Sequence, residues 1–457
     1  MFTPIGRIVS VAAAAALVVG AAGAWPAGAA SHRTARVSLG TAAGEANDGS
    51  FVPSASRDGR YVAFVSSASN LVPHDFNRKT DVFVRDTKTG ETTRISVSSK
   101  GMQANDLSYN PSISDDGRFV AFDSFASNLV PGDLNRAGDV FVHDRVTRKT
   151  ERISRGAGAE ANGQSGFAVI SGDGQHVAFE SVATNIVPVN EEYGTHLFVW
   201  DREKKASELV DRAPAGYPGN GGSGDAALSR DGRFVAFASG STNLVAGDYN
   251  KMDDVFLFDR QSRSMQRVSM TALGMESNSG SNSPTVSDDG GVVAFESLAS
   301  NLLSTDLRSL DHIGLLPKGV NPHTAGDTNG VSDIFARDMR TGTIELLSVT
   351  TPGVQGTSAS YGPSISGDGT LVAFTSFARN LTPGVEKSPG KHNEVFVRDR
   401  VARRTTLASV DDADVAADNA SNTVSMSADG SAVVFSSSAS NLVHGDRNHE
   451  ADIFLRR

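Results

Sequence analysis

The sequence contains no cysteine, which excludes several classes of site. Disulfide bridges, thiolate metal sites, cysteine nucleophiles and a lipidated N-terminal cysteine all require that residue. An excess of positive charge is also missing, because 52 acidic residues outnumber 42 lysines and arginines and give a net charge of -10 at pH 7. An acidic chain has no electrostatic footprint for nucleic acid or anionic lipid, so we expect neither as a partner.

Long hydrophobic runs are scarce, and the one of near-membrane length lies at the N-terminus. Residues 8–24 are apolar, follow Arg7 and precede the small residues Ala27-Gly28-Ala29. This order is typical of a signal peptide, so we expect residues 1–29 to be removed and residues 30–457 to be exported to the extracellular space or cell envelope. The alternative is a single retained anchor, for which the run is short and only weakly hydrophobic. No stable membrane span is expected once the signal peptide is gone.

A Ser-x-Asp-Gly turn followed by an apolar run recurs seven times, for example as SDDGRFVAFDS from Ser114. Successive copies lie 57–61 residues apart, except for one interval of 79 residues. The long interval indicates an insert at about residues 304–326 in the fifth repeat. Such a period is the signature of a repeat architecture. The turn aspartates are Asp58, Asp116, Asp173, Asp231, Asp289, Asp368 and Asp429.

Each repeat is expected to form four short strands. In the second repeat these are PSIS before the Asp-Gly hairpin signal, RFVAFDS after it, DVFVHD at residues 139–144 and KTERIS at residues 149–154. Four antiparallel strands repeated at a fixed period, with no helical pattern between them, predict a β-propeller.

The two ends of the chain predict how the ring closes. The seventh repeat stops after its third strand, DIFLRR, whereas an unattached strand, TARVS at residues 34–38, matches the fourth strand TERIS at residues 150–154. We expect the N-terminal strand to complete the last blade, which removes the exposed edges of an open ring. The prediction is one all-β domain over residues 30–457, a seven-bladed β-propeller of four-stranded antiparallel blades.

The repeat unit resembles that of a known family. Ser-x-Asp-Gly-Arg-x-Val-Ala-Phe-x-Ser, followed by Asp-Val-Phe-Val-x-Asp, is similar to the WD40-like (PD40-type) repeat of TolB-like β-propellers. The resemblance implies a propeller fold in an exported bacterial protein, and it implies no particular substrate because one fold hosts many functions. Prolyl-oligopeptidase relatives carry a similar propeller beside an α/β-hydrolase domain, but no Gly-x-Ser-x-Gly nucleophile motif occurs in this sequence.

Loop lengths predict which face of the propeller binds ligands. The first-to-second and third-to-fourth connections are short turns, whereas the second-to-third and blade-to-blade connections are long. Alternate connections of an antiparallel blade share one face, so both long sets lie on the same side, the long-loop face, where we expect function to concentrate. The insert at about residues 304–326 either covers part of this face or is a tolerated insertion packed on its own blade.

The second-to-third loop carries the pattern Asp-x-Asn-x-x-x-Asp in five blades, and His196 and Glu394 take the last position in blades three and six. Oxygen ligands at alternate positions of a turn suit Ca²⁺, so we expect some of these loops to hold a structural calcium ion. The alternative is that Asp and Asn only shape turns, since three side chains fall short of the roughly six to eight oxygens that Ca²⁺ takes. The candidate ligands are Asp75, Asn77, Asp81, Asp133, Asn135, Asp139, Asp248, Asn250, Asp254, Asp327, Asn329, Asp333, Asp446, Asn448 and Asp452.

No catalytic residue is assigned from the sequence. The ten histidines are scattered, and no two have metal-binding spacing on one element. The asparagine of Asn-Leu-Val or its variants stands in all seven repeats, which blade architecture explains better than a single active site does. These residues are Asn70, Asn128, Asn185, Asn243, Asn301, Asn380 and Asn441.

We therefore expect a monomeric binding or scaffolding propeller with a protein or peptide ligand on the long-loop face and no cofactor other than calcium. The alternative is a hydrolase or lyase whose site is assembled from several blades at the mouth of the channel. A cluster of carboxylates or a His–Asp pair on the axis would favour that alternative. Carbohydrate binding ranks third, because aromatic residues make up only 7% of the chain and sugar platforms favour them.

Overall fold

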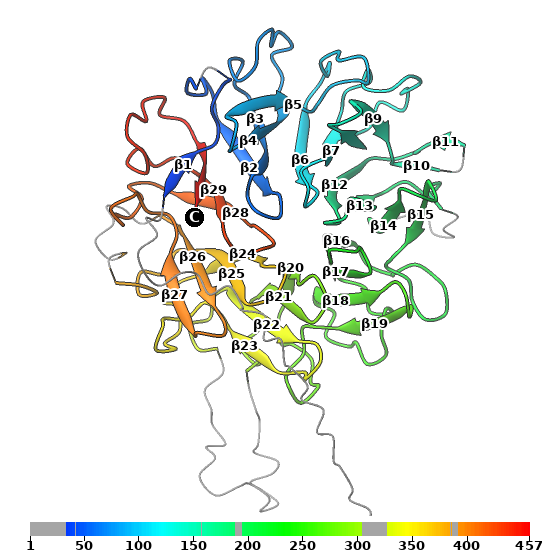
Figure 1. Ribbon diagram of the computed structural model, residues 1–457. Helices are drawn as coiled ribbons and strands as arrows, with labels where there is room; N and C mark the ends of the chain where they lie inside the picture. The colour runs from blue at the N-terminus through cyan, green and yellow to red at the C-terminus, as the bar shows by residue number, and fades with distance from the viewer. Residues whose placement is uncertain are drawn as a thin grey trace, which may run out of the picture.

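Seven four-stranded antiparallel sheets form a ring in the computed structural model of the chain (Figure 1). The structure describes residues 33–41, 43–156, 158–187, 194–303, 327–383, 385 and 392–457, and no α-helix occurs among them. The predicted all-β, seven-bladed propeller is therefore confirmed. The predicted signal peptide at residues 1–29 and the insert at residues 304–326 lie outside the described residues.

The strands follow the same order in every blade, from the axis outward. The inner strands are β2 (Ser50–Ala55), β6 (Ser108–Ile113), β12 (Ser165–Ile170), β16 (Ser223–Leu228), β20 (Ser281–Val286), β24 (Ser360–Ile365) and β28 (Ser421–Met426). The second strands are β3 (Tyr61–Ser66), β7 (Phe119–Ser124), β13 (His176–Ser181), β17 (Phe234–Ser239), β21 (Val292–Ser297), β25 (Leu371–Ser376) and β29 (Val433–Ser437).

The third strands are β4 (Asp81–Asp86), β8 (Asp139–Asp144), β14 (His196–Asp201), β18 (Asp254–Asp259), β22 (Asp333–Asp338), β26 (Glu394–Asp399) and β30 (Asp452–Arg456). The outer strands are β5 (Glu91–Arg94), β9 (Lys149–Arg152), β15 (Ala206–Leu209), β19 (Ser264–Arg267), β23 (Ile344–Leu346), β27 (Arg404–Leu407) and β1 (Thr34–Arg36). A further hairpin of β10 (Arg155–Gly156) and β11 (Ala159–Glu160), which the sequence reasoning missed, lies in the connection between blades two and three.

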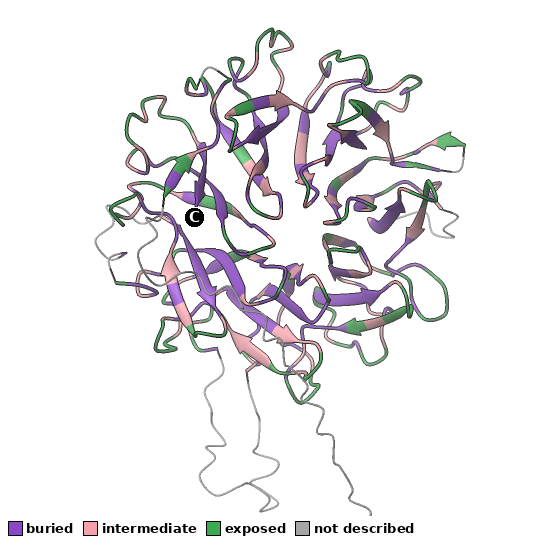
Figure 2. Cartoon of the chain, in the orientation of Figure 1, coloured by how far each residue is buried: buried purple, intermediate pink, exposed green. Residues whose placement is uncertain are grey.

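The core lies between neighbouring blades and is built mainly by the second and third strands, which are largely buried in Figure 2. In each blade a phenylalanine of the second strand stacks on one of the third strand, as Phe122 does on Phe141 with ring centroids 5.7 Å apart. The near-continuous apolar runs of these strands are explained by their burial on both faces.

The N-terminal strand closes the ring as predicted. β1 pairs with β30, and Thr34 lies opposite Arg456 while Arg36 lies opposite Phe454. The Val37 N–H extends the pairing with a hydrogen bond of 2.7 Å to the Ile453 carbonyl. In Figure 1 the blue β1 accordingly lies beside the last strands of the chain.

The asparagine of Asn-Leu-Val joins the second-to-third loop to the blade-to-blade connection before it. Asn128 Oδ1 accepts a hydrogen bond of 3.0 Å from the Asn105 N–H, and Asn128 Nδ2 donates one of 2.8 Å to the Gln103 carbonyl. The same pair of bonds recurs at Asn70, Asn185, Asn243, Asn301, Asn380 and Asn441. The architectural interpretation of this residue is confirmed.

The Ser-x-Asp-Gly turns lie at the end of the blades opposite the long loops. In the second blade Ser114 Oγ donates a hydrogen bond of 2.7 Å to Asp116 Oδ1, and Gly117 adopts a left-handed φ of +69°. A residue with a Cβ atom is strained in that conformation, which accounts for glycine after each of the turn aspartates.

Side chains at the second position of the Ser-x-Asp-Gly turns form ion pairs between blades across the ring. Arg57 of blade one donates to Asp115 of blade two at 3.1 Å and to Asp288 of blade five at 3.2 Å. Arg230 of blade four donates to the same Asp115 carboxylate at 2.7 Å. This ion-pair network crosses the axis at the short-turn end of the blades.

Candidate functional site

The five Asp-x-Asn-x-x-x-Asp loops form five separate clusters, one in each of blades one, two, four, five and seven. In each, the asparagine Nδ2 donates to the last aspartate at 2.7–3.2 Å. The other oxygen of that aspartate accepts a hydrogen bond from the serine that follows the outer strand, as Asp139 does from Ser154 at 2.5 Å. The last aspartate is fully buried in all five loops. The structure thus unites the three predicted side chains of each loop and keeps the five loops apart.

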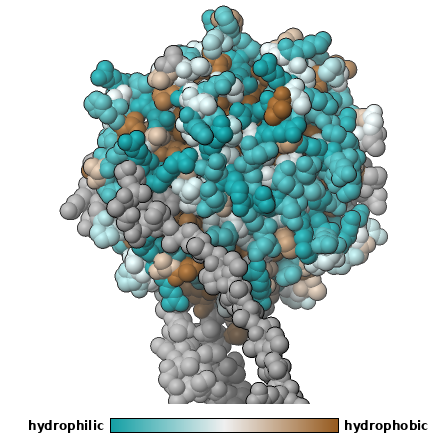
Figure 3. All heavy atoms as spheres, in the orientation of Figure 1, coloured by the Kyte–Doolittle hydropathy of each residue, from teal (hydrophilic) through white to brown (hydrophobic). Residues whose placement is uncertain are grey.

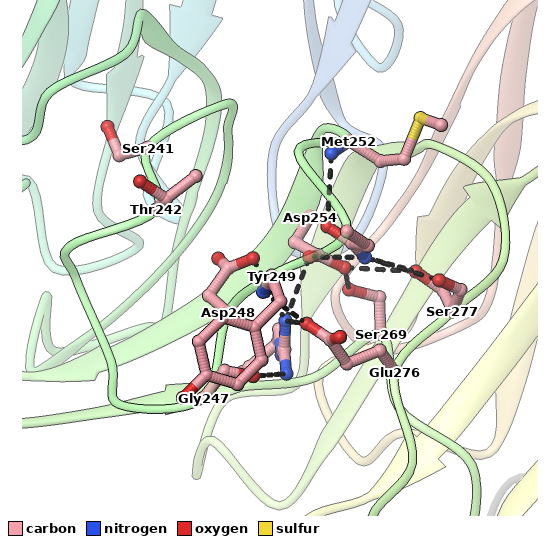
Figure 4. Close-up of polar contacts among 12 residues, drawn as sticks. Ser241, Thr242, Gly247, Asp248, Tyr249, Met252, Asp254, Ser269, Glu276 and Ser277 are labelled. Atoms are coloured by element: carbon pink, nitrogen blue, oxygen red, sulfur yellow. Dashed lines mark hydrogen bonds and ion pairs between the residues drawn. The ribbon is translucent and has the colours of Figure 1, made fainter.

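In four of the five loops an arginine from the end of the outer strand lies between the two aspartates. Arg152 Nη1, for example, lies 3.0 Å from Asp133 Oδ1 and 3.1 Å from Asp139 Oδ2. The other arginines are Arg36, Arg94 and Arg267, each within 3.0–3.6 Å of both aspartates of its loop. Figure 4 shows the fourth blade, where Asp248, Asp254 and Glu276 point toward one another around this position.

These clusters place acidic groups in a poorly solvated environment. Burial raises the pKa of Asp133 to about 6, the negative charge of Asp139 adds to the effect, and Arg152 opposes it. The guanidinium supplies the positive charge that a buried carboxylate pair needs. The sequence signal was available: an arginine stands at the same place in TTRIS, TERIS, MQRVS and TARVS.

Three blades lack this arginine. In blade three a histidine–aspartate contact replaces the carboxylate pair: His196 Nδ1 lies 2.9 Å from Asp211 Oδ2. In blade six Glu394 takes the last loop position and accepts a hydrogen bond of 2.5 Å from Ser409. In blade five both aspartates are kept while Leu346 stands in place of the arginine. Burial raises the pKa of Asp333 in that loop to about 6.

A second candidate site, which the sequence reasoning did not identify by residue, lies between the inner strands. It is a cavity of about 310 Å³, which we call the axial pocket. Its walls come from residues 52–54, 110–112, 167–169, 225–226 and 424–425, together with Glu180. No lysine or arginine is among these lining residues.

The inner strands all carry a β-bulge in which the third residue has a left-handed φ, and five of these strands line the axial pocket. Val52, with a φ of 50°, and Thr423, with a φ of 33°, are the most unusual, because β-branched residues rarely adopt a left-handed φ. Strained residues and bulges concentrate at functional sites, where they redirect backbone and side-chain groups. The other five are Asn110, Phe167, Asp225, Ser283 and Gly362.

The bulges orient backbone N–H groups toward carboxylates of the preceding blade. Asp123 Oδ2 accepts hydrogen bonds from Asn110 Nδ2 at 2.7 Å and from the Phe167 N–H at 2.8 Å. Glu180 Oε1 accepts one from the Asp225 N–H at 2.9 Å. Glu296 repeats the arrangement in blade five, with a hydrogen bond of 2.9 Å from Ser332 Oγ and a longer one from the bulge at Gly362.

These carboxylates form an acidic arc of Asp123, Glu180, Asp225 and Glu296 from four consecutive blades. Burial raises the pKa of Asp123 to about 6, and hydrogen bonds to its carboxylate oppose the change. Burial also raises the pKa of Glu180 to about 7, and the negative charges of Asp225 and Asp123 contribute in the same direction. Two acids of the arc, Asp123 and Glu180, thus have pKa values raised toward neutral pH, and perturbed pKa values cluster at functional sites.

Exposed apolar side chains lie at the long-loop ends of the inner and second strands, and Phe167 among them lines the axial pocket. Each either follows the last residue of a second strand or stands second or third in an inner strand. Phe167 is the most exposed of them, at 60%. We call this set the rim: Phe51, Phe125, Phe167, Val182, Leu298, Tyr361 and Phe377.

The sequence carried a weak signal for the axial pocket. Asp123, Glu180 and Glu296 directly follow the recurring Val-Ala-Phe core and precede the closing serine, at a position that is valine, alanine, threonine or serine in the other blades. Proline after the third inner-strand residue, as at Pro53 and Pro111, is a sign of a bulge. The side chains that converge on the axis are set by how the blades are arranged in the ring. The periodicity of the sequence alone does not give that arrangement.

Among the residues that the structure describes, no group of three or more histidine, aspartate or glutamate side chains is arranged to hold a metal ion. Within the same residues we find no helical segment with the length and hydrophobicity needed to span a bilayer.

No protein-family model matches the sequence, and no curated protein matches it. Among solved structures, the β-propeller domain of the Trilobed protease from Pyrococcus furiosus is similar over 90% of this chain and 97% of that chain, at 11% identity and a TM-score of 0.51. An oligogalacturonate lyase in complex with manganese is similar over 93% of this chain and 89% of that chain, at 14% identity and a TM-score of 0.47.

TolB from Acinetobacter baumannii is also similar, at 16% identity and a TM-score of 0.40, over 77% of this chain. The chain spans 64% of the length of that TolB. At these identities the likeness shows the fold alone. The propeller fold implied by the resemblance of the repeats is confirmed, and the chain is a seven-bladed β-propeller.

Proposed function

We propose that the chain is an exported, monomeric binding propeller that holds a peptide or protein segment on its long-loop face, with a lysine or arginine of that segment inserted into the axial pocket. The observation that carries this proposal is a pair of acids, Glu180 and Asp225, in the lining of a pocket that contains no basic residue. Asp123 of the acidic arc lies behind this lining, hydrogen-bonded to Asn110 and Phe167. The volume of about 310 Å³ is at the lower end of the range of ligand pockets, roughly 300–1,000 Å³, and suits one side chain.

Charge complementarity supports a cationic ligand group. Asp123 and Glu180 are acids whose ionised forms are disfavoured by burial, so an incoming cation would stabilise those forms. A buried charge is costly unless it is paired, and here the partner would come from the ligand. The net charge of -10 would also favour the approach of basic segments.

The rim supports a peptide or protein as the source of that cation. The face drawn in Figure 3 is largely hydrophilic, with hydrophobic residues in small groups. Exposed aromatic residues around a pocket are typical of binding surfaces, where they supply apolar contact area around a central anchor. Phe51, Phe125 and Phe377 would take this role around the mouth.

The test is a selection of random displayed peptides on the purified chain, followed by calorimetry of one enriched peptide. Enrichment of lysine or arginine next to apolar residues is expected. The Glu180→Gln variant should bind that peptide at least about tenfold more weakly, because it removes one charge from the arc.

The matched control is Glu203→Gln, which makes the same charge change on an exposed turn between the third and outer strands of blade three. It should bind the peptide as the unmodified chain does. Selection of peptides without lysine or arginine, or equal loss of affinity in both variants, would overturn the proposal.

A second candidate function is a hydrolase or lyase with its site in the axial pocket, and the carboxylates of Glu180 and Asp225 in the pocket lining are the kind of cluster expected to favour it. Two acids with raised pKa values, Asp123 and Glu180, could supply the proton donor and acceptor that such reactions need. A screen of the purified chain against hydrolase and lyase substrates tests this, provided that any activity found is lost in Asp123→Asn and Glu180→Gln. Peptide binding without turnover would favour the binding propeller.

A further inference from the structure

The fifth blade lacks the positive charge that lies between the two loop aspartates in blades one, two, four and seven. Leu346 pairs with Phe335 across β22 and β23, as Arg94 pairs with Phe83 across β4 and β5. The two positions are therefore equivalent, and leucine has replaced the arginine. Asp327 and Asp333 are nevertheless kept, and both are buried.

A glutamine shared by blades one and five shows the consequence of this replacement. In blade one, where Arg94 is present, Gln103 Nε2 donates to the His74 carbonyl, away from the aspartates. In blade five the equivalent Gln355 Nε2 donates instead to Asp327 Oδ1 and, at 2.9 Å, to Asp333 Oδ2. The carboxylates of the fifth loop thus converge on one position, which a neutral amide occupies.

This amide leaves one oxygen without a donor. Asp327 is only 7% exposed, and among the described residues its Oδ2 atom has neither a hydrogen bond nor an ion pair. Its equivalent in blade four, Asp248, also has an oxygen without a hydrogen bond, but that oxygen lies 3.3 Å from Arg267 Nη1. A buried carboxylate oxygen without a partner is costly, and it points to a missing cation.

We propose that the fifth loop binds one calcium ion between Asp327 and Asp333, in the position that a guanidinium takes in the four other loops. Both carboxylates would be ligands. The Gln355 amide, whose Nε2 now donates to both carboxylates while Oε1 accepts from the Thr328 N–H, would move aside for the ion. Water and backbone carbonyls complete the coordination of Ca²⁺ in sites of this kind.

The oxygen donors select a hard cation, and the irregular loop favours Ca²⁺ over Mg²⁺. Mg²⁺ requires a near-ideal octahedral site, whereas Ca²⁺ accepts flexible geometry and a larger number of ligands. The site is in the fifth loop and not in the axial pocket, so this proposal does not depend on the proposed peptide binding.

The first experiment measures Ca²⁺ binding to the purified chain by calorimetry, after removal of metal with EDTA. One equivalent of Ca²⁺ is expected. A thermal melt at a Ca²⁺ concentration about 100 times Kd should show Tm raised by about 3 °C over the EDTA sample, and Mg²⁺ should have a smaller effect.

Two variants locate the site. Asp327→Asn should abolish Ca²⁺ binding by removing a charged ligand. Leu346→Arg should also abolish it while raising Tm in EDTA, because the introduced guanidinium supplies the missing charge. The matched control Asp133→Asn, in the arginine-filled loop of blade two, should bind Ca²⁺ with unchanged stoichiometry.

Several results would overturn the proposal: absence of Ca²⁺ binding to the purified chain, binding that persists in Asp327→Asn, or loss of binding in Asp133→Asn. A larger Tm increase with Mg²⁺ than with Ca²⁺ would overturn the choice of ion. If Leu346→Arg does not fold, Asp327→Asn and Asp133→Asn still decide the question.

Discussion

The carboxylate of Glu180 in blade three accepts a hydrogen bond of 2.9 Å from the backbone N–H of Asp225 in blade four. The donor is the bulged, left-handed residue of the next inner strand, which has a φ of 52°. The bulge therefore holds a partly buried acid at the axis and brings a second carboxylate, that of Asp225, close to it. Burial raises the pKa of Glu180 to about 7, the negative charge of Asp225 adds to the effect, and the hydrogen bond from the Asp225 N–H opposes it. The raised pKa can be tested without knowing the ligand.

The first prediction concerns Glu180 and the pH dependence of stability. Burial raises its pKa from 4.5 to about 7, so the folded chain holds this proton more tightly than the unfolded chain does. This contribution to stability is complete below about pH 4.5, falls as the pH rises to about 7 and is absent above that. Glu180→Gln should therefore be more stable than the unmodified chain at pH 8, on the order of 1 kcal/mol once solvent screening is allowed for.

Thermal melts of both proteins between pH 4.5 and pH 8 check this prediction. The difference in Tm should shrink toward zero at the acidic end. A constant difference across the range would show that Glu180 does not titrate near neutral pH.

The second prediction concerns the arginine-filled loops. Arg267→Met in blade four would leave Asp248, Asp254 and Glu276 without their shared cation. Removing one partner of a buried ion pair costs about 3–5 kcal/mol, which should lower Tm by roughly 3–5 °C in a domain of this size. Arg263→Met, at an exposed position, is the matched control and should change Tm little. Equal effects of the two substitutions would contradict the assignment of Arg267 as the central cation.

The third prediction concerns ring closure. A chain lacking residues 1–38 loses β1, the Arg36 contacts and the Ser38 hydrogen bond to Asp452. The edge of β30 would then be unpaired, and exposed edges promote association between chains. We expect a lower Tm and aggregation, both reversed by a synthetic peptide of residues 33–48. A truncated chain that melts like the intact one would contradict the role of β1.

The fourth prediction separates blade architecture from ligand binding. Asn128→Ala removes two hydrogen bonds, and Asn243→Ala removes the same two in blade four. Each substitution should cost about 1–3 kcal/mol, because it removes two hydrogen bonds worth about 0.5–1.5 kcal/mol each. Urea unfolding measures the loss. Neither variant should alter peptide affinity, and a selective loss of binding in one of them would indicate a ligand contact there.

Much of the fold could be predicted because the repeat carries it. The Asp-Gly turns, the Val-Ala-Phe runs and the match of TARVS to TERIS together specify strand number, order and closure. The hairpin of β10 and β11 was missed because two-residue strands have no periodicity to detect. The asparagine of Asn-Leu-Val was correctly interpreted as architectural, because a residue present in every repeat is expected to make the same contact in every blade.

The sites were predictable only in part. The Asp-x-Asn-x-x-x-Asp pattern located the loop clusters, but their content depended on an outer-strand residue about 13 positions after the last aspartate, as Arg152 is from Asp139. The axial pocket depended on groups separated by a whole blade, such as Asp123 and Phe167. Contacts of that kind follow from ring geometry and leave no local pattern. Calcium binding stays a prediction, as do the signal peptide and the insert at residues 304–326.

The measurement that tests the central claim most directly is the number of protons released when a lysine-containing peptide binds. Calorimetry at pH 7, in two buffers that differ in ionisation enthalpy, gives this number. Glu180 has a pKa of about 7 in the free chain, and a cation in the axial pocket would lower it, so roughly half a proton should be released from this group. Glu180→Gln should reduce the release, and the affinity of the unmodified chain should rise between pH 5.5 and pH 8. Binding with no proton release, or with the same release in Glu180→Gln, would contradict a cation held by the acidic arc.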